Sequence, residues 1–159
     1  ICYFSQQAGE PLKLNYKKNQ FGPYADNLRH VLNVLNGHYI EGVGDHDTLE
    51  TQITLKPETI EEAEKFLSHY PESIKRINAV AKLVEGFETP YGMELLATVH
   101  WAANYDSKST SLDDVIHAVH NWEPTKPNWN KRKQTLMTRH HIAIALERLI
   151  NLKWIKKNI

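Results

Sequence analysis

Two stretches of the chain alternate between apolar and polar residues. The apolar residues of 12–16 are separated by polar ones, and this period of two predicts a half-buried strand that ends near Lys18. A second short strand bearing Tyr39 and Ile40 and a third within 51–55 are expected after the next helix. Because strands joined by short links usually pair antiparallel, we expect one small antiparallel sheet of two to three short strands.

Most other apolar residues are spaced three and four apart, as on one face of a helix. Residues 1–8 have the pattern of an apolar helix that Gly9 ends, and the turn Gly22-Pro23 precedes a helix over 24–35. Further helices are expected to begin near Pro57, Pro71, Thr89-Pro90, Ser111 and Thr138. The predicted fold class is therefore α+β and predominantly helical, with about six helices.

The helical stripes also predict which residues form the core. Those expected to face it after Pro57 and Pro71 are Ile60, Ala63, Phe66, Leu67, Ile74, Ile77, Ala81 and Val84. Residues 121–134 interrupt the helical pattern with prolines and polar residues, so we interpret them as a loop.

Length and composition fit one folded domain. Hydrophobic residues make up 41% of the 159 residues, which is enough for one core, so we interpret 1–159 as a single domain. Cys2 is the only cysteine, so no intramolecular disulfide can form and a cytoplasmic location is expected. No apolar run reaches the roughly 18 residues of a membrane span. Because the chain begins at Ile1, within an expected helix, we expect it to be a fragment of a longer protein.

Charge is balanced overall but unevenly distributed. The chain has 19 basic and 19 acidic residues, which does not favour nonspecific binding to nucleic acid. Between Glu41 and Glu94 five bases accompany twelve acids, whereas from Pro124 onward nine bases accompany one acid, Glu147. One interpretation is a charged partner for one of these regions. The other is two solvated regions that attract each other within the domain.

The histidines and the acidic turn form no recognisable catalytic or metal-binding motif. His117 and His120 are three residues apart, but no cysteine or carboxylate stands beside them at a zinc-binding spacing. The turn 44–47 resembles part of a calcium loop, yet Lys56 occupies the place of the closing glutamate. The pair at 140–141 lacks the order of a metalloprotease motif. From the residues alone we expect no catalytic residue, no metal, no cofactor and no enzyme.

Four blocks of sequence, in order along nearly the whole chain, resemble a known family, and a closing helix fits it as well. These segments are 3–14, 20–33, 37–45, 87–101 and 142–154. They resemble the C-terminal, toxin-binding domain of DarG-type antitoxins, and the opening block is distantly similar to Panacea-type antitoxin domains. Phe21, Val43 and His46 depart from the family pattern, which affects contacts of those side chains alone.

The resemblance implies a partner and a mode of action. DarG-type antitoxins combine a macrodomain, which removes ADP-ribose from thymidine in DNA, with a domain that binds the DarT toxin. DarT is an NAD-dependent ADP-ribosyltransferase that acts on single-stranded DNA. The resemblance thus implies that this chain neutralises a DarT-type toxin by protein–protein contact, with the macrodomain and its activity outside the chain. Contact with a membrane or directly with nucleic acid is not expected.

The proposed contact follows from what the toxin must bind. A protein that holds single-stranded DNA needs a basic groove with surfaces for stacking bases, so an inhibitor filling that groove is expected to offer acidic and aromatic side chains. The segment 39–50 offers both, and its glycines let a turn project. The predicted partner-binding residues are Tyr39, Glu41, Asp45, Asp47 and Glu50, followed by Tyr24 and Asp26.

The basic C-terminal region supports an alternative function. Trp129 with Lys131, Arg132 and Lys133 has the composition of a basic aromatic loop that binds nucleic acid. A nucleic-acid-binding module is therefore the competing hypothesis. The whole-chain resemblance favours the antitoxin.

Overall fold

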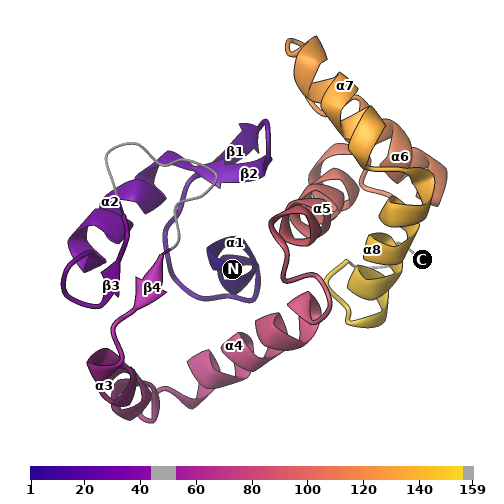
Figure 1. Cartoon of the computed structure of the whole chain (residues 1–159). Coiled ribbons are helices and arrows are strands. Elements are labelled where there is room, and N and C mark those ends of the chain that lie inside the picture. The colour runs from indigo at the N-terminus through magenta and orange to yellow at the C-terminus, as the bar shows by residue number, and fades with distance from the viewer. Residues whose placement is uncertain (44–52, 156–159) are drawn as a thin grey trace.

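The computed structural model describes residues 1–43 and 53–155, and these fold mainly as helices (Figure 1). The α-helices are α1 (Cys2–Gln7), α2 (Asp26–Leu35), α3 (Glu58–Leu67), α4 (Pro71–Val84), α5 (Pro90–Trp101), α6 (Leu112–His120), α7 (Pro127–Leu136) and α8 (Arg139–Asn151). A π-helix, η1 (Ala102–Asp106), continues α5. The strands are β1 (Tyr16–Asn19), β2 (Gly22–Ala25), β3 (Ile40–Glu41) and β4 (Thr54–Leu55). The predominantly helical α+β class is confirmed.

The hydrophobic core is built around α5, which packs against α8, β2 and α6 (Figure 1). Thr89 caps the first turn of α5 by accepting a hydrogen bond from the backbone N–H of Gly92 (3.0 Å), and Pro90 occupies the first turn. The start predicted at Thr89-Pro90 is thus confirmed. The large apolar side chains with no exposed area in the described residues are Leu83, Leu96, Val99, Val115, Val119, Trp122, Met137, Ile142 and Leu149.

The end of α1 also follows the sequence prediction. Gly9 has a positive φ of 104°, and its N–H donates to the carbonyl oxygen of Gln6 (3.0 Å). The N–H of Glu10 donates to the carbonyl oxygen of Ser5 (3.0 Å). This pair of bonds is a Schellman motif, and glycine suits it because it has no Cβ to oppose the left-handed backbone.

The first strand is shorter than predicted and pairs with a strand that the sequence analysis missed. Lys13 has a positive φ of 55°, so the regular strand begins only beyond it. β1 and β2 pair antiparallel with Asn19 opposite Gly22. Gly22 and Pro23 therefore lie in a strand rather than in the expected turn, which is made by residues 20–21. Proline is tolerated here because β2 is an edge strand of this two-stranded sheet.

Gly22 occupies a point where the hairpin comes close to α5. Its φ is +107°, and a Cβ at this position would lie 3.1 Å from Thr98 Oγ1. The residues after Gly22 remain extended through Ala25, so α2 begins at Asp26 instead of Tyr24.

The described strands form two separate sheets instead of the single sheet that we expected. β3 pairs antiparallel with β4, with Ile40 opposite Leu55 and Glu41 opposite Thr54. Between the two hairpins lies α2, whose ten residues span roughly 15 Å. This helix carries the chain away from β2 before β3 begins.

The elements from α2 to the first half of α4 form an arm that curves around α1 (Figure 1). We define the arm as residues 26–41 and 53–77. Among these residues Ile40 is the one that is buried. The rest of α4 joins the core through Val80, Leu83 and Val84.

The arm overturns the prediction that most apolar residues after Pro57 and Pro71 face the core. No residue of α3 is buried, and Ile74 and Ile77 of α4 are 37% and 43% exposed. Of the predicted core residues in these two helices, Val84 is buried. An amphipathic pattern shows that one face of a helix avoids water, but it does not identify what covers that face.

A second correction concerns the region after α6. The polar stretch that we interpreted as a loop contains α7, and Pro127 lies at the first position of this helix. Proline fits there because the first N–H groups of a helix have no partner within it.

Candidate functional site

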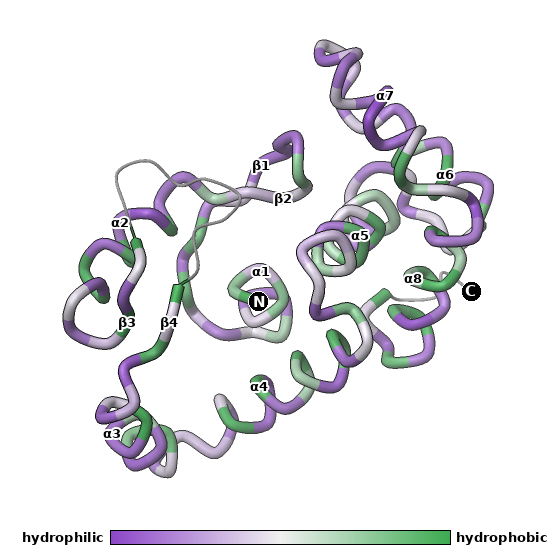
Figure 2. Tube along the Cα trace, in the orientation of Figure 1, coloured by the Kyte–Doolittle hydropathy of each residue, from purple (hydrophilic) through white to green (hydrophobic). Residues whose placement is uncertain are grey.

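The arm exposes large apolar side chains on α3 and on the first half of α4, where hydrophobic and polar residues alternate along the trace (Figure 2). Phe66 is 63% exposed, and its ring centroid lies 4.8 Å from that of Tyr70. Clustered apolar side chains on a protein surface commonly mark an interaction site. We call the set Ile60, Phe66, Tyr70, Ile74 and Ile77 the apolar face.

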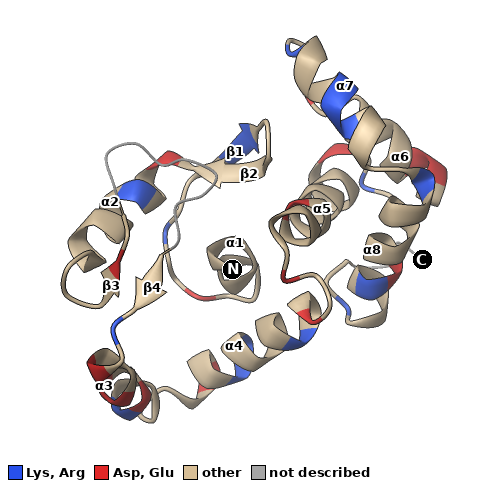
Figure 3. Ribbon diagram, in the orientation of Figure 1, with Lys and Arg blue, Asp and Glu red and all other residues tan. Residues whose placement is uncertain are grey.

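Acidic residues lie on the same part of the arm (Figure 3). Helix α3 carries Glu58, Glu61, Glu62 and Glu64 against a single base, Lys65, and all five are exposed. Carboxylates beside apolar side chains suit a partner surface that is apolar and basic.

Tyr24 and Asp26, predicted to bind a partner, lie where the first hairpin meets α2. Tyr24 is 40% exposed and stands opposite Lys17 in the sheet. The Lys17 ammonium forms an ion pair with the Asp26 carboxylate, and both side chains remain more than 60% exposed. Such a surface pair contributes little to stability, so Asp26 can exchange Lys17 for a partner at small cost.

Tyr39 and Glu41 lie at the other end of α2. The Tyr39 hydroxyl donates to a carboxylate oxygen of Glu62 (3.4 Å), which links the second hairpin to α3. Glu41 faces Thr54 across the sheet and forms an ion pair with Lys56 (3.5 Å). Both predicted residues remain accessible on the arm, at 40% for Tyr39 and 65% for the Glu41 side chain.

The structure divides the predicted partner-binding residues into two groups. Asp26 begins α2 and Tyr39 follows its end, so the length of the helix, roughly 15 Å, separates the groups. Outside the described residues lie Asp45, Asp47 and Glu50. Most residues of the apolar face were predicted from the sequence to lie in the core. Its periodicity was visible in the sequence, but its exposure was not.

A cluster of charged side chains is buried between α5 and α7. Lys133 has no exposed area, and its ammonium donates to the Glu94 carboxylate (2.7 Å) and to Thr98 Oγ1 (3.2 Å). Arg132 binds the same carboxylate through both terminal nitrogens. Burial raises the pKa of Glu94, but the hydrogen bonds from Arg132 and Lys133 outweigh this effect and hold the pKa below its ordinary value.

This cluster takes up two of the basic residues on which the alternative function, nucleic-acid binding, was predicted. Arg132 and Lys133 are directed to Glu94 inside the protein, whereas Lys131 is exposed. Lys126 lies over the ring of Trp129, with 5.9 Å from its ammonium to the ring centroid. The expected loop of basic and aromatic residues is instead the helix α7, and two of its basic residues, Arg132 and Lys133, point into the protein.

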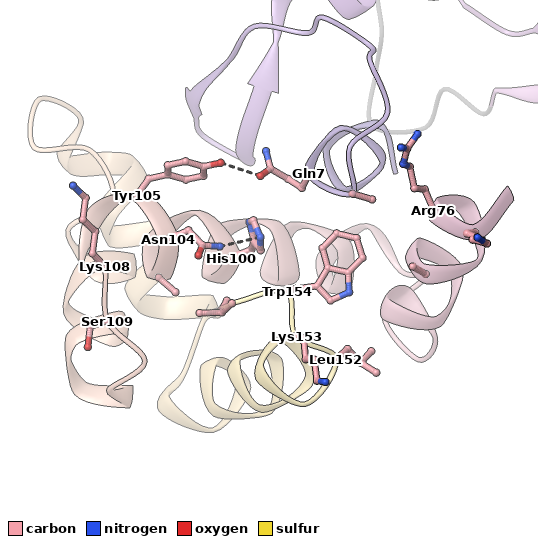
Figure 4. A pocket seen from close by; sticks show the side chains of 15 residues that line it. Gln7, Arg76, His100, Asn104, Tyr105, Lys108, Ser109, Leu152, Lys153 and Trp154 are labelled. Carbon is pink, nitrogen blue, oxygen red and sulfur yellow. Dashed lines mark hydrogen bonds between the residues drawn. The ribbon is translucent and has the colours of Figure 1, made fainter. Parts of the chain in front are cut away.

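A pocket of about 780 Å³ opens between the end of α1, helix α4, helix η1 and the segment after α8 (Figure 4). The Tyr105 hydroxyl donates to Gln7 Oε1 (2.9 Å), a contact that joins η1 to α1 along the pocket. The basic residues that line it are Lys75, Arg76, Lys108 and Lys153.

His100 also lines this pocket and is 2% exposed. Its Nδ1 lies 2.8 Å from the Tyr3 hydroxyl, and the Asn104 side-chain amide lies 2.9 Å from its Nε2. Burial lowers the pKa of His100 to about 4. The imidazole is therefore neutral near pH 7, and the positive charge of the pocket comes from its lysine and arginine side chains.

The described residues contain no group of three or more His, Cys, Asp or Glu side chains placed to hold a metal ion. Their helices are also too short or too polar for any of them to cross a membrane.

No protein-family model matches the chain. It is 44% identical over 152 residues to a protein of Thermus aquaticus named DNA ADP-ribosyl glycohydrolase, an alignment covering 94% of this chain and 39% of that protein. Proteins of the same name from Mycobacterium bovis and Mycobacterium tuberculosis are 29% identical over 156 residues, covering 94% of this chain and 42% of each relative. The chain thus spans about two fifths of the length of these curated relatives.

These relatives correct the expectation that the protein is not an enzyme. All three are named for an enzymatic activity, and each aligns with nearly the whole of this chain. The expectation rested on the absence of a recognisable catalytic motif from the sequence. The names of these relatives also support a resemblance to DarG-type proteins, without specifying a toxin-binding domain. Over nearly its whole length, the chain is therefore similar to part of three DNA ADP-ribosyl glycohydrolases.

Proposed function

We propose that this chain forms part of a DarG-type DNA ADP-ribosyl glycohydrolase, in which it binds a DarT-type toxin and neutralises it by direct protein contact. The similarity to the three relatives supports the broader part of the proposal. The observation that carries the toxin contact is the apolar face of the arm, because each of its five large side chains is more than a third exposed.

The energy available from this face is sufficient for a specific contact. Burying a large apolar side chain completely contributes about 1.5–3 kcal/mol, and the apolar face offers five that are now 37–63% exposed. Aromatic residues such as Phe66 and Tyr70 are enriched at the centres of protein interfaces. The apolar face therefore provides the anchor of the proposed contact.

The carboxylates of α3 provide the charge complementarity. A toxin that binds single-stranded DNA presents basic side chains to phosphates, and the exposed acids Glu61 and Glu64 offer negative charge beside an apolar surface. Tyr39 adds an exposed ring on the same arm. Inhibition on this view is by occlusion, in which the arm occupies the groove that holds DNA.

Three isoleucines of nearly equal exposure provide a matched test. Ile60 and Ile77 on the arm are 45% and 43% exposed, and Ile144 on α8 is 44% exposed. We expect Ile60→Ser and Ile77→Ser each to raise the Kd for a catalytically inactive DarT-type toxin by about tenfold, because each removes roughly 1–2 kcal/mol of apolar burial. The change for Ile144→Ser should stay below about twofold.

The measurement is isothermal titration calorimetry of the chain with the toxin. A chain that does not bind the toxin at all would contradict the proposed function. Equal effects of the three substitutions would contradict the placement of the contact on the arm.

A further inference from the structure

The pocket shown in Figure 4 carries positive charge that the proposed toxin contact does not use. Its described lining includes four basic residues and no carboxylate. Arg76 donates a hydrogen bond from one terminal nitrogen to the Glu10 carboxylate (3.0 Å), and Lys75 pairs with the Glu72 carboxylate (2.6 Å) at an exposed position. A guanidinium has five N–H donors and an ammonium three, so both groups can bind an anion while keeping these partners.

The backbone around the pocket is unusual. Helix η1 is a π-helix, a rare form that often marks functional sites, and it supplies Ala103, Asn104 and Tyr105 to the lining. Of the three non-glycine residues with positive φ in the described chain, Lys108 (50°) and Lys153 (62°) both line this pocket. At Lys153 this backbone ends α8 in a Schellman motif, because its N–H donates to the carbonyl oxygen of Ile150 (3.0 Å) and the N–H of Trp154 to that of Leu149 (2.8 Å). At Lys108 the left-handed backbone costs energy, and such strain concentrates at ligand-binding sites.

The remaining lining suits the other parts of a nucleotide. Trp154 is half-buried and Tyr105 is 47% exposed, and their rings provide flat surfaces on which a base can stack. Gln7 and Asn104 supply side-chain amides for hydrogen bonds to polar edges. The volume of about 780 Å³ falls within the range of roughly 300–1,000 Å³ found for small-molecule sites.

We propose that this pocket binds a nucleoside phosphate, with the phosphates among the four basic side chains and the base against an aromatic ring. The site is separate from the apolar face, because Lys75, Arg76 and Ala79 project from one side of α4 and Ile74 and Ile77 from the opposite side. Nucleotide binding thus goes beyond the proposed toxin contact and does not depend on it.

Calorimetry of the 159-residue chain tests the proposal with ADP, adenosine and inorganic phosphate as separate probes. We expect ADP to bind at least about tenfold more tightly than either of the other two, because it alone combines charge-assisted contacts with stacking. Adenosine binding as tightly as ADP, or an absence of ADP binding, would overturn the proposal.

Two double variants with equal loss of charge locate the site. Lys75→Gln with Lys153→Gln removes two lysines of the pocket, and Lys126→Gln with Lys131→Gln removes two exposed lysines of the α7 region. The first pair should weaken ADP binding at least about tenfold and the second less than about twofold. An equal loss of ADP affinity in both double variants would show nonspecific electrostatic attraction and would refute the proposed site.

A short thymidine oligonucleotide, titrated in the same way, separates a free nucleotide from a nucleotide within a DNA strand. Because the volume of about 780 Å³ is that of a small-molecule site, we expect ADP to bind and the oligonucleotide not to compete with it. Binding of the oligonucleotide alone would refute a site for free nucleotides.

Discussion

The ammonium of Lys133, which has no exposed area, lies 2.7 Å from a carboxylate oxygen of Glu94, which is itself 8% exposed. Arg132 binds the same carboxylate and also lies over the ring of Phe21, with 4.7 Å from the guanidinium carbon to the ring centroid. The cluster therefore connects α7, α5 and the tip of the first hairpin. An unpaired charge left inside a protein is costly, so each member depends on the others.

Replacing Glu94 should destabilise the fold strongly. Glu94→Gln leaves the buried Lys133 without its counter-charge, and we expect the free energy of unfolding to fall by about 3–5 kcal/mol. Urea denaturation followed by circular dichroism measures this change. The control is Asp113→Asn, which breaks the exposed pair with Arg139 and should cost less than about 1 kcal/mol. Equal effects of the two substitutions would show that burial of the pair does not matter.

Gly92 should resist replacement although it lies inside a helix. A Cβ at this position would lie 2.6 Å from the carbonyl oxygen of Phe87, so Gly92→Ala forces the backbone to shift and should cost about 3 kcal/mol. Helix propensity alone predicts the opposite sign, a gain of about 1 kcal/mol. Gly86→Ala is the comparison, because that position has a φ of +84° but open space and should cost about 1–2 kcal/mol. A stabilising Gly92→Ala in thermal denaturation would disprove this close approach.

Acidification should unfold the protein through His100. Burial lowers its folded-state pKa from 6.5 to about 4, so between these values the unfolded state binds more protons and stability falls as the pH is lowered. The loss amounts to at most about 3 kcal/mol between pH 6.5 and 4. The lowered pKa of Glu94 acts in the same direction, but at lower pH. Denaturation curves at several pH values should show this slope in the parent and a flatter one in His100→Gln.

Removing acids from α3 should slow toxin binding. Under the proposed function, Glu61→Gln with Glu64→Gln should lower the association rate constant about tenfold at low salt, because exposed charges mainly steer the encounter. The matched control is Asp113→Asn with Glu147→Gln, two exposed acids outside the arm. Surface plasmon resonance at two salt concentrations measures both. Identical association rates for the two double variants would contradict steering by α3.

The proposed occlusion makes a further prediction about DNA. If the arm fills the groove that holds single-stranded DNA, an unreactive oligonucleotide should displace the chain from the toxin, and its apparent affinity should fall as the oligonucleotide concentration rises. Competition measured by fluorescence anisotropy tests this. A stable complex of toxin, DNA and this chain would instead indicate inhibition from a distant site.

Local signals in the sequence correctly predicted several elements. Gly9 ends α1, Thr89 and Pro90 begin α5, and Thr138 caps α8 by accepting a hydrogen bond from the N–H of His141 (3.3 Å). These features depend on backbone conformation and on partners three or four residues away, so neighbouring residues are enough to specify them. The same local logic failed at Gly22-Pro23, where contact with α5 favours a strand over a turn.

By itself the sequence determined the helical class, most helix starts and the amphipathic pattern of each helix, because these follow from residues close together in the chain. The tertiary structure alone decided which apolar faces are covered. It leaves Phe66 and Ile77 exposed on the arm, places Lys133 against Glu94, 39 residues away, and gathers Arg76, Lys108 and Lys153 around one pocket. Apolar spacing has the same form whether the face meets the core or a partner, and contacts between distant residues depend on how the helices pack.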